Sequence, residues 1–181
     1  KIESGVGSQL RYYFNKQPYL DIYTVEDTTS QDTIEVDLPG SVHTKMHDGP
    51  LYLSPNQDWL FVTHNYYFAN QEDQKNLYID YYQRAEEEWG DPEVLPFCHE
   101  SYSVQHPTFW PASQTLTFSS NKPGGYGGFD LYSTTYSDTG WSRPENLGPV
   151  INSVYDEVFP FLDPQGRLGF STNRLGSLGG L

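Results

Sequence analysis

Short segments with alternating apolar and polar residues recur along this chain, separated by turn residues. In residues 116–121, Leu-Thr-Phe-Ser-Ser-Asn, the apolar side chains of Leu116 and Phe118 occupy alternate positions. A period of two is typical of a β-strand with one buried face. The best helical window, residues 84–89, is short and runs directly into Gly-Asp-Pro. The pattern therefore predicts an all-β protein with many short strands.

The alternating segment occurs four times at a nearly constant spacing. Each copy begins with Leu and ends with Asn, and the copies are residues 10–15, 60–65, 116–121 and 168–173. Downstream, Tyr23, Tyr78 and Tyr132 follow one another at spacings of 55 and 54 residues. Trp89 returns as Trp141 after 52 residues. A fixed period of this length indicates a repeat architecture.

About 50 residues holding four short strands is the length of one β-propeller blade. We therefore predict four-stranded antiparallel blades within one partial propeller, residues 1–181. The predicted divisions are a partial blade at about 1–45, blades at 46–100 and 101–152, and a partial blade at 153–181. A β-sandwich is the structural alternative, but it does not require nearly identical turns at a fixed period. Residues 54–58 and 163–166 have the composition of tight hairpin turns.

The phase of the repeat predicts that the ring does not close within this chain. The last copy stops before its expected Asp and Tyr strand, and only nine residues precede Leu10. We expect a part of a larger propeller of about six or more blades, within the usual range of roughly four to eight.

Composition narrows the functional classes. The net charge is −14 with only ten Lys and Arg residues, which argues against nucleic-acid binding. The single Cys98 excludes an intrachain disulfide and leaves the redox compartment open. No stretch approaches 18 apolar residues, so no direct membrane span is predicted. The first five residues do not form a signal peptide.

The Gly-rich residues 123–128 are the segment most easily mistaken for a ligand loop. A phosphate loop ends in Gly-Lys-Ser/Thr before a helix, whereas this one leads into a predicted strand. We interpret it as a tight connection between strands. Asp21 and Asp130, with Asn76 in the equivalent place, recur once per repeat, so we expect these side chains to accept backbone N–H groups.

No residue is predicted to be catalytic, to bind a cofactor or to hold a metal. The histidines lack metal-binding spacing, and they are His43, His47, His64, His99 and His106. The neighbours Cys98 and His99 do not form a dyad by adjacency alone. Neighbouring acids, at residues 86–88 and 156–157, point to opposite faces of a strand and are poor glycosidase pairs. Asp-rich turns are a further type of Ca²⁺ ligand, but the sequence contains no twelve-residue EF-hand loop. The aromatic clusters, at residues 66–68 and 78–82, are expected to pack mainly between blades.

Three stretches carry a family resemblance, and they are residues 95–97 with 102–107, residues 123–132, and residues 146–152 with 156–161. Together they resemble the TolB-like propeller of Bacteroidetes OmpA-family proteins, including PorE-like components of type IX secretion. With the preceding blade, the resemblance covers roughly residues 43–181. Cys98-His99 and Gln57-Asp58 depart from the family pattern at turns.

This resemblance implies a periplasmic protein associated with the outer membrane and paired with an envelope partner, such as a PorP/SprF-type barrel. Peptidoglycan binding would reside in an OmpA-like domain outside this sequence. The resemblance therefore implies a non-enzymatic envelope scaffold. Two alternatives stay open: a propeller enzyme, either a hydrolase, a lyase or a peptidase gating domain, and a carbohydrate-binding propeller.

Overall fold

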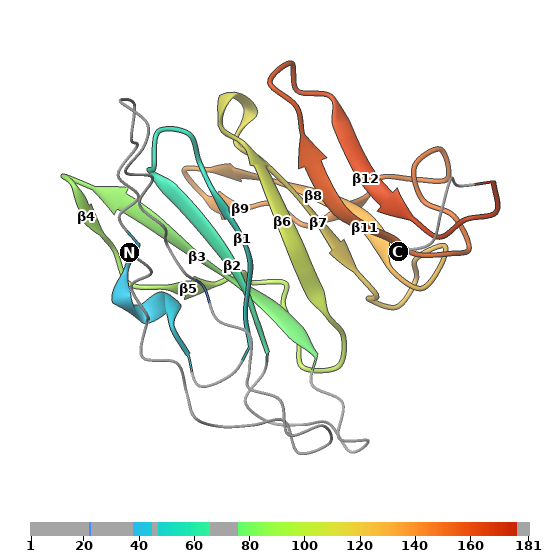
Figure 1. Cartoon of the computed structure of the whole chain (residues 1–181), viewed down its shortest axis with the longest axis horizontal. Helices are drawn as coiled ribbons and strands as arrows, with labels where there is room; N and C mark the ends of the chain where they lie inside the picture. Colours follow the sequence, from blue (N-terminus) through green and yellow to red (C-terminus); the bar gives the residue numbers. More distant parts are fainter. Residues whose placement is uncertain (1–21, 23–37, 45–46, 66–75, 177–181) are drawn as a thin grey trace, which may run out of the picture.

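The protein is all-β, as the alternating pattern predicts. The computed structural model describes residue 22 and residues 38–44, 47–65 and 76–176. In this part, antiparallel sheets make up the body, and the two helical elements are single 3-10 turns, η1 (Gly40–Val42) and η2 (Pro111–Ser113) (Figure 1).

The first two sheets share one strand order. The first consists of β1 (Asp48–Leu53), β2 (Trp59–Asn65), β3 (Leu77–Ala85), β4 (Glu88–Trp89) and β5 (Glu93–Val94). The second consists of β6 (Val104–Trp110), β7 (Thr115–Ser120), β8 (Asp130–Ser137), β9 (Gly140–Trp141) and β10 (Glu145–Asn146). In each of these sheets, the three long strands pair in sequence order. The two short strands, β4 and β5 in the first sheet and β9 and β10 in the second, both pair with the third long strand and so share the outer position. The third sheet contains β11 (Glu157–Leu162) and β12 (Leu168–Thr172).

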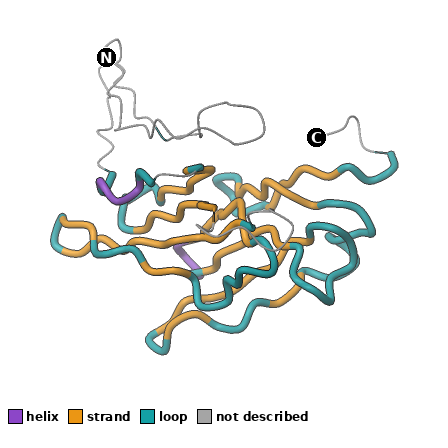
Figure 2. The backbone as a smooth tube through the Cα atoms, turned by 90° about the horizontal axis from the view of Figure 1, so that it is seen from below, coloured by secondary structure: helices purple, strands orange, loops and turns teal. Residues whose placement is uncertain are grey.

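The sheets lie side by side and do not close on themselves. Their first strands are neighbours, because β6 contacts both β1 and β11 (Figure 1). Viewed from below, the strands form the interior and the loops gather at their ends (Figure 2). This arrangement places the connections β7–β8 and β10–β11 at one end of the strands, and the turns β6–β7 and β11–β12 at the other.

Alternation along β2 explains where the core lies. Trp59 and Phe61 point to the second sheet and join a cluster that includes Phe109, whereas Leu60 and Val62 face the opposite side. All four β2 side chains are buried, because this strand lies inside its sheet. The prediction that aromatic residues fill the space between sheets is confirmed for Tyr81, which lies in the cluster shared with the second sheet, whereas Tyr82 is buried on the opposite face of β3. Residues 66–68 lie outside the described residues.

The first strand of each of the three sheets, β1, β6 and β11, carries a bulge immediately before a proline. Gly49, His106 and Phe159 have positive φ angles of 104°, 56° and 50°, and the strand register shifts at each of them. Proline fits a bulge because it has no N–H to donate to the ladder. The bulges also join sheets: the His106 ring stacks on Phe159 with centroids 3.8 Å apart, and its Nδ1 accepts the Phe159 N–H at 3.3 Å.

Both predicted hairpin turns are confirmed. Gln57 N–H donates to the Ser54 carbonyl, and Gly166 N–H donates to the Asp163 carbonyl, each at 2.8 Å.

The equivalence of Tyr78 and Tyr132 is wrong by two residues. Tyr78 pairs with His64, the fifth residue of its repeat segment, whereas Tyr132 pairs with Phe118, the third residue of its segment. Between the paired residues at the fifth position of each segment, 13 residues separate His64 from Tyr78 but only 9 separate Ser120 from Asp130, so a fixed spacing does not give the ladder register.

Candidate functional site

Asp130, at the start of β8, organises the Gly-rich loop. Its carboxylate accepts the N–H groups of Tyr126 at 2.6 Å and Gly127 at 3.1 Å, and the side-chain amide of Asn146 at 2.8 Å. The prediction that this recurring acid accepts backbone amides is confirmed. Asp21 lies outside the described residues.

Asn76 does not repeat the role of Asp130. Its side-chain amide donates to the Glu100 carbonyl at 2.7 Å, and its Oδ1 accepts the Ser103 hydroxyl at 3.2 Å. The structure therefore corrects the expected equivalence, because Asp130 pairs with Ser120 in its ladder, whereas Asn76 lies before Leu77, the first paired residue of β3.

The glycines allow the loop 123–128 to pack against the connection 147–156. A Cβ atom on Gly127 would lie 2.1 Å from the Tyr155 carbonyl oxygen and 2.4 Å from that of Ser153. The loop is a tight connection between strands, as predicted.

Gly127→Ala is therefore expected to lower the free energy of unfolding by about 1–3 kcal/mol, because backbone must move. Gly40→Ala is the matched control, since a Cβ there meets nothing within 4 Å and the backbone has no positive φ. Urea denaturation followed by circular dichroism measures both. Equal losses of unfolding free energy in the two variants would contradict the close approach of Gly127 to the Ser153 and Tyr155 carbonyls.

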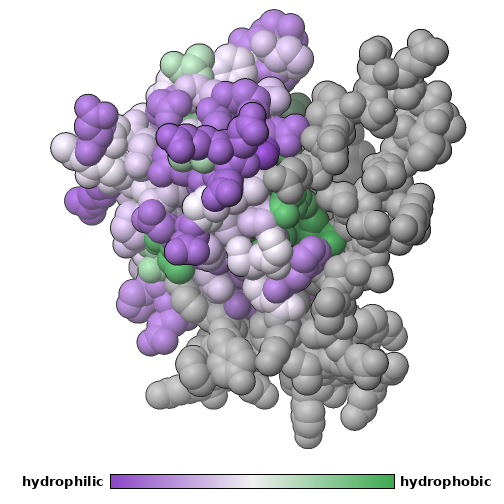
Figure 3. Space-filling view, turned by 90° about the vertical axis from the view of Figure 1, so that its left-hand side faces the viewer, coloured by the Kyte–Doolittle hydropathy of each residue, from purple (hydrophilic) through white to green (hydrophobic). Residues whose placement is uncertain are grey.

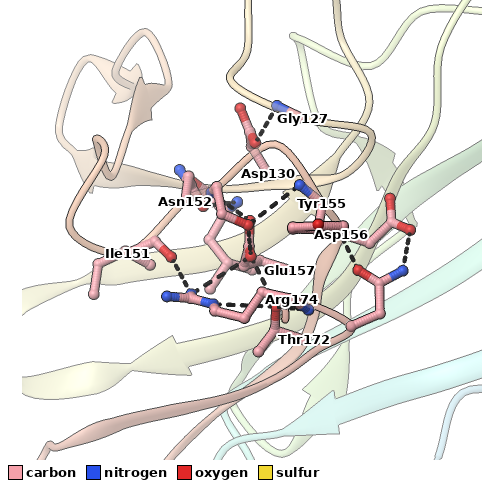
Figure 4. A network of polar contacts seen from close by, with 12 residues as sticks. Gly127, Asp130, Ile151, Asn152, Tyr155, Asp156, Glu157, Thr172 and Arg174 are labelled. Carbon is pink, nitrogen blue, oxygen red and sulfur yellow. Dashed lines mark hydrogen bonds and ion pairs between the residues drawn. The ribbon is translucent and has the colours of Figure 1, made fainter. Parts of the chain in front are cut away.

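Glu157, the first residue of β11, is fully buried and anchors the connection that precedes it (Figure 4). Its carboxylate accepts the Ser153 N–H at 2.8 Å, the Ser153 hydroxyl at 2.6 Å and the Thr172 hydroxyl at 2.9 Å. The Arg174 guanidinium lies 3.5 Å from the carboxylate and also donates to the Ile151 carbonyl at 2.7 Å. These contacts tie both strands of the third sheet, at the end where Glu157 pairs with Thr172, to the loop.

A second clamp holds the same connection to the second sheet. The buried Asn152 side chain accepts the Leu131 N–H at 2.8 Å and donates to the Leu131 carbonyl at 2.9 Å. The Asn152 side chain therefore makes the two hydrogen bonds to the Leu131 backbone that a neighbouring strand would make.

The segments held in this way are residues 123–128, 148–156 and 173–176, which we call the loop end. They meet because the Gly128 N–H donates to the Tyr155 carbonyl at 3.1 Å and Arg174 reaches Ile151. Apolar side chains nevertheless project into solvent from this rigid frame, and they are Tyr126, Val150, Val154 and Leu175. The loop end is the candidate functional site, and its exposed apolar side chains suit it to binding.

The strongest candidate for chemistry is a buried cluster on the first sheet. His64 Nδ1 lies 3.0 Å from Asp48, and His64 Nε2 lies 3.6 Å from Asp80, which is too long for a hydrogen bond. The Tyr78 ring packs against the imidazole with centroids 5.7 Å apart. No spacing in the sequence indicates that these residues meet.

Their electrostatics fit a structural role. Burial favours the neutral form of Asp48, but hydrogen bonds from His64 and Thr44 outweigh it and lower its pKa. Burial raises the pKa of Asp80, and the nearby His64 offsets this only in part. Burial likewise raises the pKa of Tyr78 to about 12. Because Asp48 and His64 are 3% and 1% exposed, a substrate in solvent does not reach the pair.

The repeat supports the same interpretation. Asp48 accepts the N–H and the hydroxyl of Thr44, four residues earlier, just as Glu157 accepts both groups of Ser153, four residues earlier. A group that occupies the same position in two sheets is better explained by folding than by a single active site.

The other sequence candidates remain dispersed. His99 bonds to Ser101 in an exposed turn, and the Cys98 thiol has its pKa raised by burial to about 12. Glu86, Glu87 and Glu88 are exposed at the β3–β4 turn, while Asp156 accepts the Phe129 N–H at 2.9 Å. Across the described ranges, no three His, Cys, Asp or Glu side chains converge as metal ligands.

His106 gives a pH prediction, because burial lowers its pKa to about 4. The unfolded chain, with an ordinary histidine pKa near 6.5, binds more protons between these values. The stability contribution is complete above about pH 6.5 and is lost as the pH falls through about 4, by on the order of 3 kcal/mol.

His106→Asn is the variant that tests it, since Asn tolerates positive φ and its Oδ1 can accept the Phe159 N–H. The difference in unfolding free energy between wild type and variant, measured by urea titration from pH 7 to 4, should shrink or reverse on acidification. Parallel curves would refute the assignment.

No family model matches this chain, and no curated protein is significantly similar to it. The TolB-like resemblance therefore stays a prediction. None of the helices in the described ranges has the length and apolar character needed to cross a bilayer.

Proposed function

We propose that this chain belongs to a β-propeller that acts as a non-enzymatic scaffold in the cell envelope. The parent would be a periplasmic, outer-membrane-associated protein of the OmpA family linked to type IX secretion, with a PorP/SprF-type barrel as partner. Peptidoglycan would be bound only by a domain outside this sequence.

The propeller part of the proposal is supported by the way successive sheets attach to one another. Thr63, the fourth residue of its repeat segment, accepts the N–H of His106 on the next first strand at 3.3 Å. Ser119, the fourth residue of the following segment, donates to the Glu157 carbonyl on the next first strand at 2.8 Å. A repeated contact between one sheet and the next is what radial packing of blades requires.

The scaffold part rests on one observation: the candidate catalytic groups of the described chain hold the fold. Asp130 and Glu157 bind loop backbone, and the Asp48–His64 pair is buried. A propeller enzyme would instead present such groups at an open mouth.

The test uses the full-length protein in its native cells. An affinity-tagged copy should fractionate with outer membranes and co-purify with an outer-membrane barrel protein after mild solubilisation. Recovery of the tagged protein from the cytosol, or from envelopes with no barrel protein enriched over an untagged strain, would refute the proposed function.

A further inference from the structure

We propose that three largely buried side chains of the first sheet, His64, Asp48 and Asp80, form a proton latch. These side chains, which we call the trio, hold one proton between His64 Nε2 and the Asp80 carboxylate at neutral pH. Loss of this proton at higher pH frees residues 38–44 from the first sheet. The latch goes beyond the proposed scaffold function and does not depend on it, because it describes how the fold responds to pH.

Hydrogen-bond satisfaction is the first reason. The pKa of Asp48 is lowered, so this carboxylate is ionised and accepts the proton of His64 Nδ1 at 3.0 Å. In a neutral ring the other nitrogen is then a bare acceptor. Within the described residues, His64 Nε2 is buried without a hydrogen-bond partner, and it lies 3.6 Å from Asp80 Oδ2. An acceptor that faces a carboxylate is satisfied only when one of the two gains a proton.

Charge is the second reason. The side chains of His64, Asp48 and Asp80 are 1%, 0% and 13% exposed. With a neutral ring, two ionised carboxylates would approach the same imidazole in a site largely closed to water, and like charges at short range disfavour ionisation. One added proton leaves the trio with a net charge of −1, whether His64 or Asp80 carries it. Burial raises the pKa of Asp80, the direction that favours a retained proton.

The repeat supplies the third reason. His64 occupies the ladder position that Thr172 occupies in the third sheet, each opposite the buried acid that begins the first strand of its sheet. The Thr172 hydroxyl donates to its acid without titrating. Asp80 pairs with the third residue of its repeat segment, and in the second sheet Tyr132 stands at that place. The fold therefore forms without either ionisable group, and the first sheet has both.

The other titratable groups around the trio keep their protons in the same pH range. Burial raises the pKa of Tyr78, Tyr82 and Cys98 to about 12, and all three interact electrostatically with Asp80. Two further histidines, His43 and His47, lie in the connection that precedes β1 and are partly exposed. A readout specific to one residue separates them from the trio.

Asp48 is the member of the trio that can move. It is the first residue of β1, directly before the Gly49 bulge, and it also accepts the N–H and the hydroxyl of Thr44. Asp80 instead lies inside β3, with paired strands on both sides. Repulsion in a deprotonated trio is therefore relieved when Asp48 moves toward water and takes residues 38–44 with it.

Release of residues 38–44 would uncover apolar surface. Val42 is fully buried against Leu60, Val62 and Tyr82 on the outer face of the first sheet. With these residues in place, the described residues on the side of the molecule that carries η1 and β4 are mostly hydrophilic (Figure 3). The trio thus holds the cover of an apolar face.

The direction of the pH effect follows from the proton count. An unfolded chain gives up carboxyl protons near pH 4 and a histidine proton near pH 6.5. The folded trio holds its proton beyond pH 6.5, so its contribution to stability is complete below that pH and is lost as the pH rises further. The unfolding equilibrium constant then rises by up to about tenfold per pH unit. The titration of His106 lies below this window.

Asp80→Asn tests the latch, because an asparagine amide can donate to His64 Nε2 without a titratable proton. Urea denaturation of both proteins from pH 6 to 9.5 gives their unfolding constants. The ratio of wild type to variant should rise by about tenfold or more across this range. The ratio of wild type to Asp138→Asn, an exposed control, should stay constant. Parallel curves for wild type and Asp80→Asn would overturn the proposal.

Nitrogen-15 and carbon-13 NMR of the wild type give a second measurement that needs no variant. At pH 7 the His64 ring should carry protons on both nitrogens, or its Nε2 should accept a hydrogen bond from a protonated Asp80. A neutral ring in either tautomer beside an ionised Asp80 would refute the latch.

Hydrogen exchange locates the opening. Between pH 7 and 9, after correction for the intrinsic exchange rate, residues 38–44 and 48–53 of the wild type should lose protection by about tenfold or more, whereas residues 104–120 keep theirs. In Asp80→Asn both regions should stay protected. Equal loss in the two sheets, or no loss in residues 38–44, would show that the proton does not hold this segment.

Discussion

Trp59→Ala is expected to lower the free energy of unfolding by about 3–5 kcal/mol, the usual range for removing a buried large aromatic side chain. Trp59 is 5% exposed and its ring joins two sheets. Its centroid lies 4.9 Å from that of Tyr136, 5.1 Å from Phe109 and 5.8 Å from Trp141, all on the second sheet. Alanine would leave a void between the sheets, and rigid neighbouring strands can close it only in part.

Trp89→Ala is the matched control, because Trp89 lies on the outer strand β4 and is only partly buried. We expect a loss at least about twofold smaller, because less apolar area is uncovered. Urea denaturation followed by far-ultraviolet circular dichroism measures both, so the lost tryptophan fluorescence does not interfere. Equal losses would show that the contact between the first two sheets is not a major source of stability.

Alternation and turn chemistry were enough to predict the sheets, because both signals are local. The alternating Leu60 and Val62 are buried on β2, and the Ser54 turn forms where the sequence places it. The register of strand pairing could not be predicted in this way, because it depends on residues far apart in sequence. Counting outward from the β1–β2 hairpin would place Gly49 opposite His64, but the bulge shifts the pairing and brings Asp48 there instead.

The candidate site was predicted only in part for a related reason. Asp130 could be interpreted from the sequence because its partners, Tyr126 and Gly127, lie within four residues. Glu157 was set aside as one of two neighbouring acids, although Ser153 four residues earlier is a usable signal once Thr44 and Asp48 show the same spacing. The contact of Arg174 with Ile151 had no local signal, because it depends on the packing of two connections.

The exposed apolar side chains of the loop end could not be distinguished from core residues in the sequence. Val150 and Val154 lie in a stretch that also contains the buried Asn152, so polarity alone predicts the reverse of what is found. The side chain of Asn152 imitates a strand and thereby turns its apolar neighbours outward. A polar residue at the centre of this connection is thus what leaves the apolar side chains exposed.

The second large effect is expected for Glu157→Ala, at about 3–5 kcal/mol, the cost of removing one partner from a buried charged network. The change leaves the Ser153 N–H and the Thr172 hydroxyl without their acceptor and the Arg174 guanidinium without its ion-pair partner. Unsatisfied buried donors are costly because they have lost water as well as their partner.

Glu145→Ala, an exposed glutamate on β10, is the control and should change stability by less than about 0.5 kcal/mol. Thr172→Val removes the hydroxyl that donates to Glu157 and accepts the Arg174 backbone N–H at 3.2 Å, and it should cost roughly 1–2 kcal/mol alone. In the Glu157→Ala background it should cost much less, because the hydroxyl no longer has the carboxylate to bind. Urea denaturation of the four proteins completes this cycle. Additive losses would mean that Thr172 and Glu157 act separately, and the anchor that holds the loop end in place would then have to lie elsewhere.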